Sequence, residues 1–224
     1  MIRSAAFSDI EIPIRRNKMR NKSNKKIRLF GIIALLLVFS LLLSSCSKKF
    51  VSDGADYKDK KTNVTYAYAP FCYEAIATSD EEYAKTGNSV FYAIEGQDPL
   101  KWLCESSGTV FYSKSITLPT LDKMNISYIE ICAETASVTV KSTITDGGDI
   151  AAIISSYVSE APLSYFGDVA SSSYKIRFAD TSLGLYYSVS FFAYSDGSAY
   201  LFNRSENRFV KAPAELLNYI NALG

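Results

Sequence analysis

The hydrophobic positions of this chain follow two different patterns, which meet near residue 45. Residues 29–43 form a nearly continuous apolar run, interrupted only by Gly31 and Ser40. Beyond it, short segments rich in Val, Ile, Thr, Tyr and Phe are separated by turn residues, which is typical of β-strands. We expect strands over residues 64–68, 72–78, 89–95, 109–113, 125–133 and 137–144, and further strands within residues 185–211.

Two segments have the spacing of amphipathic helices. After Asp149, which can cap a helix, apolar side chains recur three, four, seven and eight positions beyond Ile150, and Pro162 ends the pattern. A second helix is expected to begin at Pro213, because proline is favoured in the first turn. The predicted fold class is therefore α+β: a mostly antiparallel sheet with about two packed helices, in a single domain.

The strongest turn signal is Asp196-Gly197, which lies between two aromatic-rich runs. This dipeptide favours a two-residue type I′ hairpin with the glycine at positive φ. Such a turn would place Ala193 opposite Tyr200 and Phe191 opposite Phe202, with these pairs facing the core.

The opposite side of the same strand carries Tyr186, Phe192 and Tyr194. Tyrosine rings have an apolar body and a polar tip, a combination that suits the binding of peptides and glycans. These three aromatic residues are the candidate ligand-binding residues, although tyrosine in a half-buried sheet is the simpler explanation.

Charge divides the chain at the same place as hydropathy. Residues 1–45 hold nine Lys/Arg against Asp9 and Glu11, a net charge of +7, and the remaining residues hold 15 Lys/Arg against 21 Asp/Glu, a net charge of −6. As a helix, the apolar run rises about 22 Å, short of the roughly 30 Å core of a bilayer. A basic region, a short apolar region and small residues together make a secretory signal peptide.

The apolar run ends in Leu43-Ser44-Ser45-Cys46, which resembles the lipobox of bacterial lipoproteins. The resemblance covers residues 15–46. It implies cleavage between Ser45 and Cys46 and a lipid on Cys46, and two or more acyl chains hold a protein stably at a membrane. The expected location is the cell membrane, lipid-anchored and facing the extracytoplasmic side. The alternative is an uncleaved anchor in which Cys46 is an incidental thiol.

The predicted organisation follows from these boundaries. Residues 1–18 are an N-terminal extension before a possible start at Met19, and residues 19–45 are the signal peptide. Residues 46–61 are rich in Lys and Asp and poor in apolar side chains, which predicts a solvated tether. The exported domain then spans residues 62–224, long enough to bury a core.

The candidate chemistry is limited by the absence of histidine from the sequence. This absence excludes Ser-His-Asp and Cys-His catalysis and His-ligated zinc. No spacing of carboxylates identifies a catalytic pair, and no group of ligands indicates a metal or cofactor. We therefore name no catalytic residues, no metal and no cofactor, and the acidic exported part argues against nucleic acid as a partner.

Three cysteines remain once Cys46 is lipidated: Cys72, Cys104 and Cys132. Their apolar neighbours predict buried, unreactive thiols. One structural disulfide with a leftover thiol is the alternative.

The leading functional hypothesis is a non-catalytic binding or accessory module of the cell envelope, with a protein, peptide or cell-wall ligand. A cell-envelope hydrolase that uses carboxylates and an inhibitor or sensor subunit of a membrane complex are the alternatives.

Overall fold

A computed structural model describes residues 48–134, 137–164 and 169–223. The predicted N-terminal extension, signal peptide and lipobox, with Ser45 and Cys46, lie outside the described residues. Ser47–Gly224 form one compact unit. Within the part of the chain that the structure describes, no helix has the length and apolar character needed to cross a membrane.

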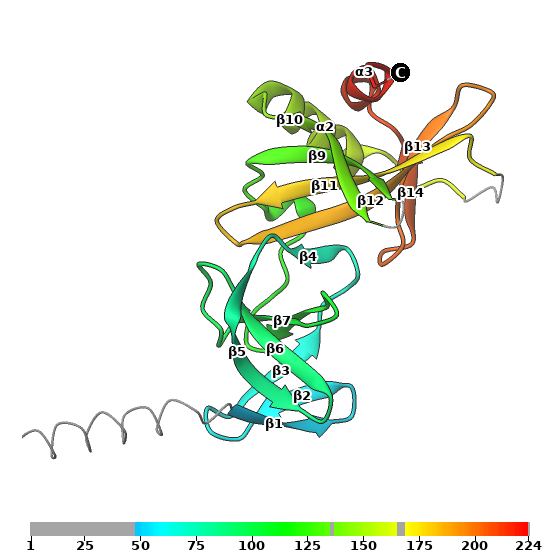
Figure 1. The fold of residues 1–224 in the computed structure, drawn as a ribbon. Coiled ribbons are helices and arrows are strands. Elements are labelled where there is room, and N and C mark those ends of the chain that lie inside the picture. The colour runs from blue at the N-terminus through cyan, green and yellow to red at the C-terminus, as the bar shows by residue number, and fades with distance from the viewer. Residues whose placement is uncertain (1–47, 135–136, 165–168, 224) are drawn as a thin grey trace, which may run out of the picture. The chain divides into compact units, whose positions relative to one another are not determined.

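The described chain consists mainly of β-strands (Figure 1). The strands are β1 Lys48–Asp53, β2 Asp56–Asp59, β3 Val64–Tyr68, β4 Tyr73–Ala75, β5 Thr78–Thr86, β6 Ser89–Ile94, β7 Trp102–Glu105, β8 Val110–Ser113, β9 Tyr128–Glu134, β10 Val138–Ile144, β11 Ser172–Asp180, β12 Leu185–Ala193, β13 Ala199–Asn203 and β14 Arg208–Lys211. The helices are the 3-10 turn η1 Leu121–Lys123, α2 Gly147–Ser159 and α3 Ala214–Asn221.

Seven strands close into a barrel in the order β1-β2-β3-β8-β7-β6-β5. The ring is closed by β1 and β5, which run parallel, with Lys48 opposite Ala84 and Lys49 opposite Lys85. Buried side chains, most of them aromatic, fill the interior, as expected for a small barrel. They are Phe50, Tyr66, Ala84, Phe91, Leu103 and Phe111.

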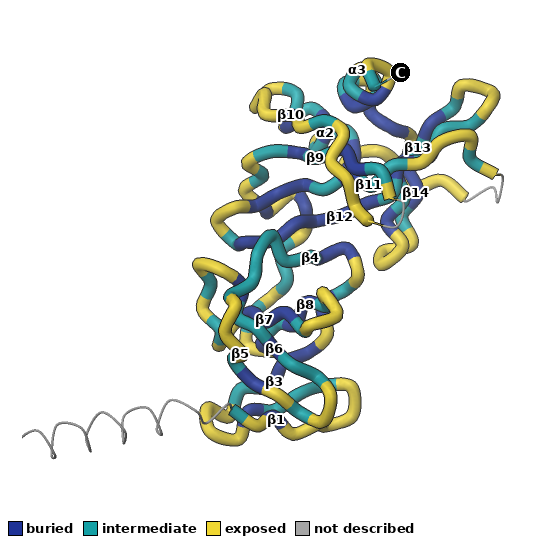
Figure 2. Tube along the Cα trace, in the orientation of Figure 1, coloured by how far each residue is buried: buried dark blue, intermediate teal, exposed yellow. Residues whose placement is uncertain are grey.

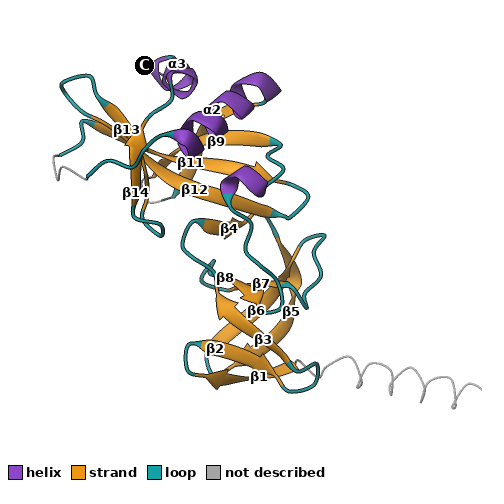
Figure 3. Cartoon of the chain, turned by 180° about the vertical axis from the view of Figure 1, so that it is seen from behind, coloured by secondary structure: helices purple, strands orange, loops and turns teal. Residues whose placement is uncertain are grey.

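The remaining strands form a second sheet in the order β10-β9-β11-β12-β13-β14. The short strand β4 pairs with the first half of β12, and β13 pairs with the second half. Helices α2 and α3 pack on one face of this sheet (Figure 3). Buried residues lie along β9, β11 and β12, which form the centre of the sheet (Figure 2).

The two helices occur where the apolar spacing predicts them. Ile150, Ile153 and Tyr157 of α2 are buried against the sheet. The cap of α2 is Asp146 rather than Asp149, because the Asp146 carboxylate accepts a hydrogen bond from the Asp149 backbone N–H. The α+β fold class predicted around these helices is nevertheless wrong.

The predicted fold class is corrected by the barrel. The described residues are mostly β, with a closed seven-stranded barrel beside a second sheet and two α-helices, and not a single antiparallel sheet with helices packed on it. Closure requires the pairing of β1 with β5, and the paired residues of these two strands are 36 positions apart in the sequence. No local pattern of apolar positions encodes such a contact, because strand periodicity reports only which face of a strand is buried.

The predicted tether over residues 46–61 is also corrected, since it contains β1 and β2. One apolar side chain, Phe50, enters the barrel core and is 4% exposed. The buried Asp59 closes the next turn by accepting hydrogen bonds from the Lys61 N–H at 2.8 Å and the Thr62 hydroxyl at 2.7 Å. Within the described residues, folded structure is therefore already present from Lys48 and not only from residue 62, because backbone pairing holds these polar strands in the ring.

The hairpin between β12 and β13 differs by one residue from the predicted one. Ala193 lies opposite Ala199, and Phe191 lies opposite Leu201. Because the side chains of a strand alternate between faces, this one-residue shift places Leu201 in the core and Phe202 on the opposite face.

The cause of the shift is the turn itself. The Gly197 N–H donates to the Tyr194 carbonyl, and the Tyr194 N–H donates to the Ser198 carbonyl, which leaves three residues in the loop. Gly197 has a φ of +83°, so its predicted positive φ is confirmed. The arrangement is that of a turn followed by a glycine bulge, and it competes with the two-residue turn wherever an Asp-Gly pair is available.

Candidate functional site

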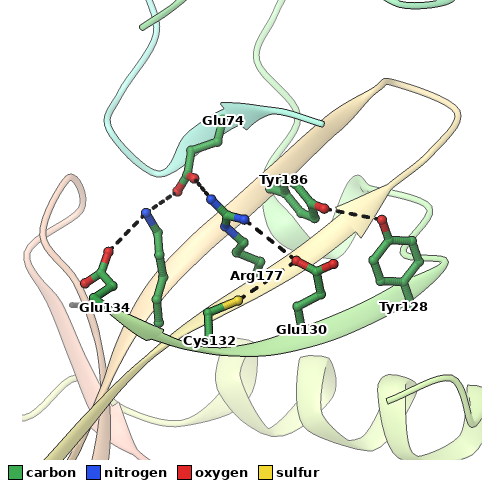
Figure 4. Close-up of polar contacts among 8 residues, drawn as sticks. Glu74, Tyr128, Glu130, Cys132, Glu134, Arg177 and Tyr186 are labelled. Atoms are coloured by element: carbon green, nitrogen blue, oxygen red, sulfur yellow. Dashed lines mark hydrogen bonds and ion pairs between the residues drawn. The ribbon is translucent and has the colours of Figure 1, made fainter. Parts of the chain in front are cut away.

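The face of the second sheet that the helices leave free carries a group of charged side chains (Figure 4). We call this group the charged cluster. It consists of Glu74, Glu130, Glu134, Lys175 and Arg177.

Strand periodicity places the cluster on one face. On β11, Ile176 and Phe178 belong to the core beneath the helices, so Lys175 and Arg177 point to the opposite side. The register then sets Glu130 of β9 directly opposite Arg177. The sequence of each strand therefore fixes the face, and the ladder brings opposite charges together.

Ion pairs connect all five members. Glu74 contacts both cations: its Oε1 lies 2.8 Å from Lys175 Nζ, and its Oε2 lies 2.8 Å from an Arg177 guanidinium nitrogen. Lys175 Nζ also lies 3.3 Å from Glu134 Oε1, and Arg177 lies 3.8 Å from Glu130 Oε2. Lys175 is thus shared between one buried carboxylate and one that reaches the solvent.

Four of the five side chains are largely withdrawn from water. The exposed fractions of the Glu74, Glu130, Lys175 and Arg177 side chains lie between 14% and 21%, whereas Glu134 is 55% exposed. Burial by itself would raise the pKa of Glu74, but the hydrogen bonds and charges of Lys175 and Arg177 outweigh it and lower that pKa. Glu74 is therefore held as a carboxylate.

An aromatic pair borders the cluster on its Arg177 side. The guanidinium carbon of Arg177 lies 4.8 Å from the centre of the Tyr186 ring, a cation–π distance. The hydroxyls of Tyr186 and Tyr128 lie 3.4 Å apart. The Tyr186 ring, Glu74 and Glu130 therefore all contact the Arg177 guanidinium.

Three hollows open onto the cluster. The first, of about 400 Å³, is lined by Lys175, Glu134 and Arg204 together with Cys72 and Ser188. The second, of about 450 Å³, includes Glu74 and Arg177 and reaches Glu105 of the barrel.

The third hollow, of about 350 Å³, lies beside the other two, because it shares Lys175 with the first and Glu74 with the second. Phe71 lines both the first and third hollows and is 74% exposed. Phe71 therefore offers a ligand an apolar contact at the rim of a polar site.

The pKa shifts of Glu74 and of the two nearby thiols do not favour a nucleophile or a general acid at these three residues. Cys132 lies beside the charged cluster, but burial raises the pKa of its thiol, and burial likewise raises the pKa of Cys72 in the first hollow to about 11. A thiol with a raised pKa is a poor nucleophile. A general acid at neutral pH needs a raised carboxyl pKa, whereas that of Glu74 is lowered. The arrangement is suited to holding a charged ligand.

The three thiols agree with the sequence-based prediction. Cys72, Cys104 and Cys132 are unpaired and buried, so the alternative of one disulfide among them is excluded by this structure. No group of three or more potential metal ligands occurs within the described parts of residues 48–223.

The predicted aromatic site is divided by the structure. Tyr186 borders the charged cluster and is 8% exposed. Phe192 lies six positions further along β12, about 20 Å away at strand spacing. Tyr194 packs on Tyr200 beside the hairpin loop, with 5.9 Å between ring centres. The three residues therefore do not form one binding site, and Tyr186 belongs to a different one.

Sequence reasoning missed the charged cluster, although part of its signal is visible. In Lys175-Ile176-Arg177-Phe178, basic and apolar residues alternate, and the stretch from Ile129 to Glu134 alternates acidic with mostly apolar residues. Two strands of opposite charge pattern are compatible neighbours. Glu74 gives no such signal, because it reaches the cluster only through the pairing of β4 with β12.

Comparison with known proteins provides no relative for this domain: no family model, no curated protein and no solved structure matches the chain.

Proposed function

We propose that this chain is a bacterial lipoprotein, anchored through a lipid on Cys46 at the extracytoplasmic side of the membrane, whose domain is a non-catalytic module that binds a peptide at the charged cluster. The lipobox at residues 43–46 supports the anchoring. The observation that carries the binding function is the set of four charged side chains, each less than a quarter exposed, on a sheet face lined by open hollows.

The energetics of buried ion pairs support a functional role. Removing charged groups from water is unfavourable, and well-packed apolar residues at such positions are often at least as stabilising. An apolar sheet face covered by a third helix would therefore be an equally stable solution. The presence of charges in this place is better explained by a ligand that needs them.

The chemistry of the cluster favours a peptide. Lys175 forms ion pairs with both Glu74 and Glu134. A ligand carboxylate can therefore pair with Lys175 while a ligand ammonium group pairs with the exposed Glu134. Every charge remains paired in that exchange, which keeps its free-energy cost low. A short peptide supplies both charges, and an apolar side chain of the peptide can pack on Phe71.

Calorimetric titration of the detergent-purified full-length protein with short charged peptides, including peptides released from cell walls, tests the binding function. Phe71→Ala and Glu134→Gln change exposed side chains, so they should preserve the fold and weaken binding at least fivefold. Val158→Ala is the matched control, because Val158 is 41% exposed on α2, on the opposite face of the sheet from the cluster. Binding that is unaffected by the first two variants, or absent for every peptide, would refute this function.

The anchoring is tested separately. Metabolic labelling with a fatty-acid analogue should label the wild-type protein, and Cys46→Ala should lose the label. Label that persists in Cys46→Ala, or wild-type protein released without lipid, would contradict the lipoprotein assignment.

A further inference from the structure

The distance along the chain between the proposed lipid and the barrel is very short. Lys48 is the first residue of β1, and Ser47 alone separates it from Cys46. Two residues span at most about 7 Å when fully extended. A lipid on Cys46 would therefore hold the start of β1 at the membrane surface, a step that rests on the proposed anchoring.

The outer surface of the barrel beside that start is basic. Phe50 points into the barrel, so Lys49 and Val51 on either side of it point outward. The register places Lys85 opposite Lys49 and Lys58 opposite Val51. We call these four residues, Lys49, Val51, Lys58 and Lys85, the basic face.

The neighbourhood adds further positive charge. Lys60 and Lys61 are exposed in the turn after β2. Acidic groups on these strands include Glu82, which lies 3.4 Å from Lys85 Nζ, and the facing pair Asp53 and Asp56 at the far end of the β1–β2 hairpin. Asp56 forms an ion pair with Lys114. Lysines outnumber carboxylates on the basic face and in this turn, although residues 46–224 as a whole carry a net charge of −6.

The ladder places two positive charges directly opposite each other on this face. Like charges directly opposite each other in neighbouring strands destabilise a sheet, and Lys49 and Lys85 are such a pair. An anionic surface removes this repulsion. Val51, 39% exposed between the lysines, can enter the headgroup layer.

We propose that the basic face docks on anionic phospholipid headgroups of the membrane that holds Cys46, and so fixes the orientation of the barrel on that membrane. A lipid anchor combined with a basic patch is a stable pair of membrane signals. The acidic remainder of the domain is repelled by the same surface, so only this side of the barrel turns toward the bilayer. Each lysine near an anionic surface strengthens attachment about fivefold.

Depth quenching of a fluorophore tests the docking. Val51→Cys and the matched Val138→Cys, 39% and 40% exposed as valines, are labelled selectively, because Cys72, Cys104 and Cys132 are buried. The full-length lipidated proteins are reconstituted into vesicles of phosphatidylcholine, with or without phosphatidylglycerol, that contain a quencher-bearing lipid. We expect quenching at position 51 only with phosphatidylglycerol, and none at position 138.

Charge variants complete the test. Lys49→Gln combined with Lys85→Gln should shift the docking equilibrium by on the order of 25-fold, and added salt should weaken docking in the wild type. Equal quenching at both positions, equal quenching in both lipid mixtures, or a label at position 51 that stays fully exposed on anchored protein would overturn the docking and leave the face free for another acidic partner. Absence of lipid on Cys46 would instead overturn the anchoring, and the docking with it.

Discussion

The barrel and the second sheet bury one side of a β-sheet in two different ways. The barrel closes on itself, so its inner face packs against itself without any helix, and aromatic rings fill the space. The second sheet stays open, so α2 and α3 must cover one face with aliphatic and aromatic side chains. The open solution leaves a second face available, and the charged cluster lies on that face.

The difference explains where binding can occur. Side chains that include Phe50, Phe91 and Phe111 fill the barrel interior, so a ligand there would have to displace them. The outer surface of the barrel is the part that can interact, and there the basic face lies. The sheet instead offers hollows on the face opposite its helices, lined by the charged cluster on one side and by residues of the barrel on the other. The two proposals accordingly involve different parts of the domain: membrane contact is proposed for the barrel and ligand binding for the sheet.

The largest expected effect breaks the barrel core. Phe91 is fully buried, and its ring lies 5.3 Å from Phe50 and 5.4 Å from Phe111. Phe91→Ala should lower the free energy of unfolding by about 4 kcal/mol, because it leaves a cavity in a ring that cannot collapse. Denaturant titration followed through Trp102 of β7 measures the loss. Phe91→Leu should cost about 1 kcal/mol, and a similar loss in both variants would show that the interior is not tightly packed.

A second change probes where the barrel meets the sheet. Gly184 precedes β12 with a φ of +64°, and an added Cβ would lie 2.9 Å from Ile94 of the barrel strand β6. Gly184→Ala should cost about 3 kcal/mol, since backbone strain and overpacking both act.

Gly197 is the matched control for that change. It has a φ of +83° with nothing within 4 Å of the added Cβ, so Gly197→Ala should cost about 1 kcal/mol. Equal losses at the two glycines, measured by denaturant titration, would mean that the contact with Ile94 carries no stability.

A third change tests the charged cluster through pH. Glu74→Gln removes the carboxylate that pairs with both cations and should cost about 2 kcal/mol at neutral pH. Folding lowers the pKa of Glu74 from its unfolded value near 4.5. The ionised Glu74 therefore contributes its full stabilisation above that pH, and this stabilisation is lost as the pH falls through the lower pKa of the folded state.

The stability difference between wild type and Glu74→Gln should therefore shrink below about pH 4. The other acidic groups titrate in both proteins, so their effect on stability cancels in this difference. The exposed Glu134→Gln should change stability by less than about 0.5 kcal/mol. A Glu74→Gln difference that stays constant on acidification would exclude an ionised Glu74 as a source of stability.

The smallest expected effect tests whether loosening α2 affects the second sheet alone or the barrel as well. Asp146→Ala removes the side-chain cap of α2 and should cost about 1 kcal/mol. Amide hydrogen exchange should show faster opening in α2 and unchanged protection in the barrel strands β3 and β8. Faster exchange in those strands as well would mean that barrel and sheet open as one unit.

The sequence was sufficient for the parts that depend on local chemistry. Apolar spacing located α2 and α3, since a helix buries residues three and four apart along the chain. Strand β3 occurs at its predicted residues 64–68, and the glycine of the Asp196-Gly197 pair has the positive φ that its side-chain-free backbone permits. The resemblance of residues 43–46 to a lipobox is also a local pattern, but it lies outside the described residues and stays a prediction.

The tertiary structure decided what depends on distant partners. β1 and β2 carry few apolar residues and read as a tether, yet pairing with β5 and β3 makes them barrel strands. The register of the β12–β13 hairpin was set by one residue of loop length, which exchanged Leu201 and Phe202 between faces. Glu74 joined the cluster through β4, 56 positions before Glu130 in the sequence. Periodicity states which side of a strand is buried but not which strand lies beside it, because that choice is made by backbone hydrogen bonds common to every residue.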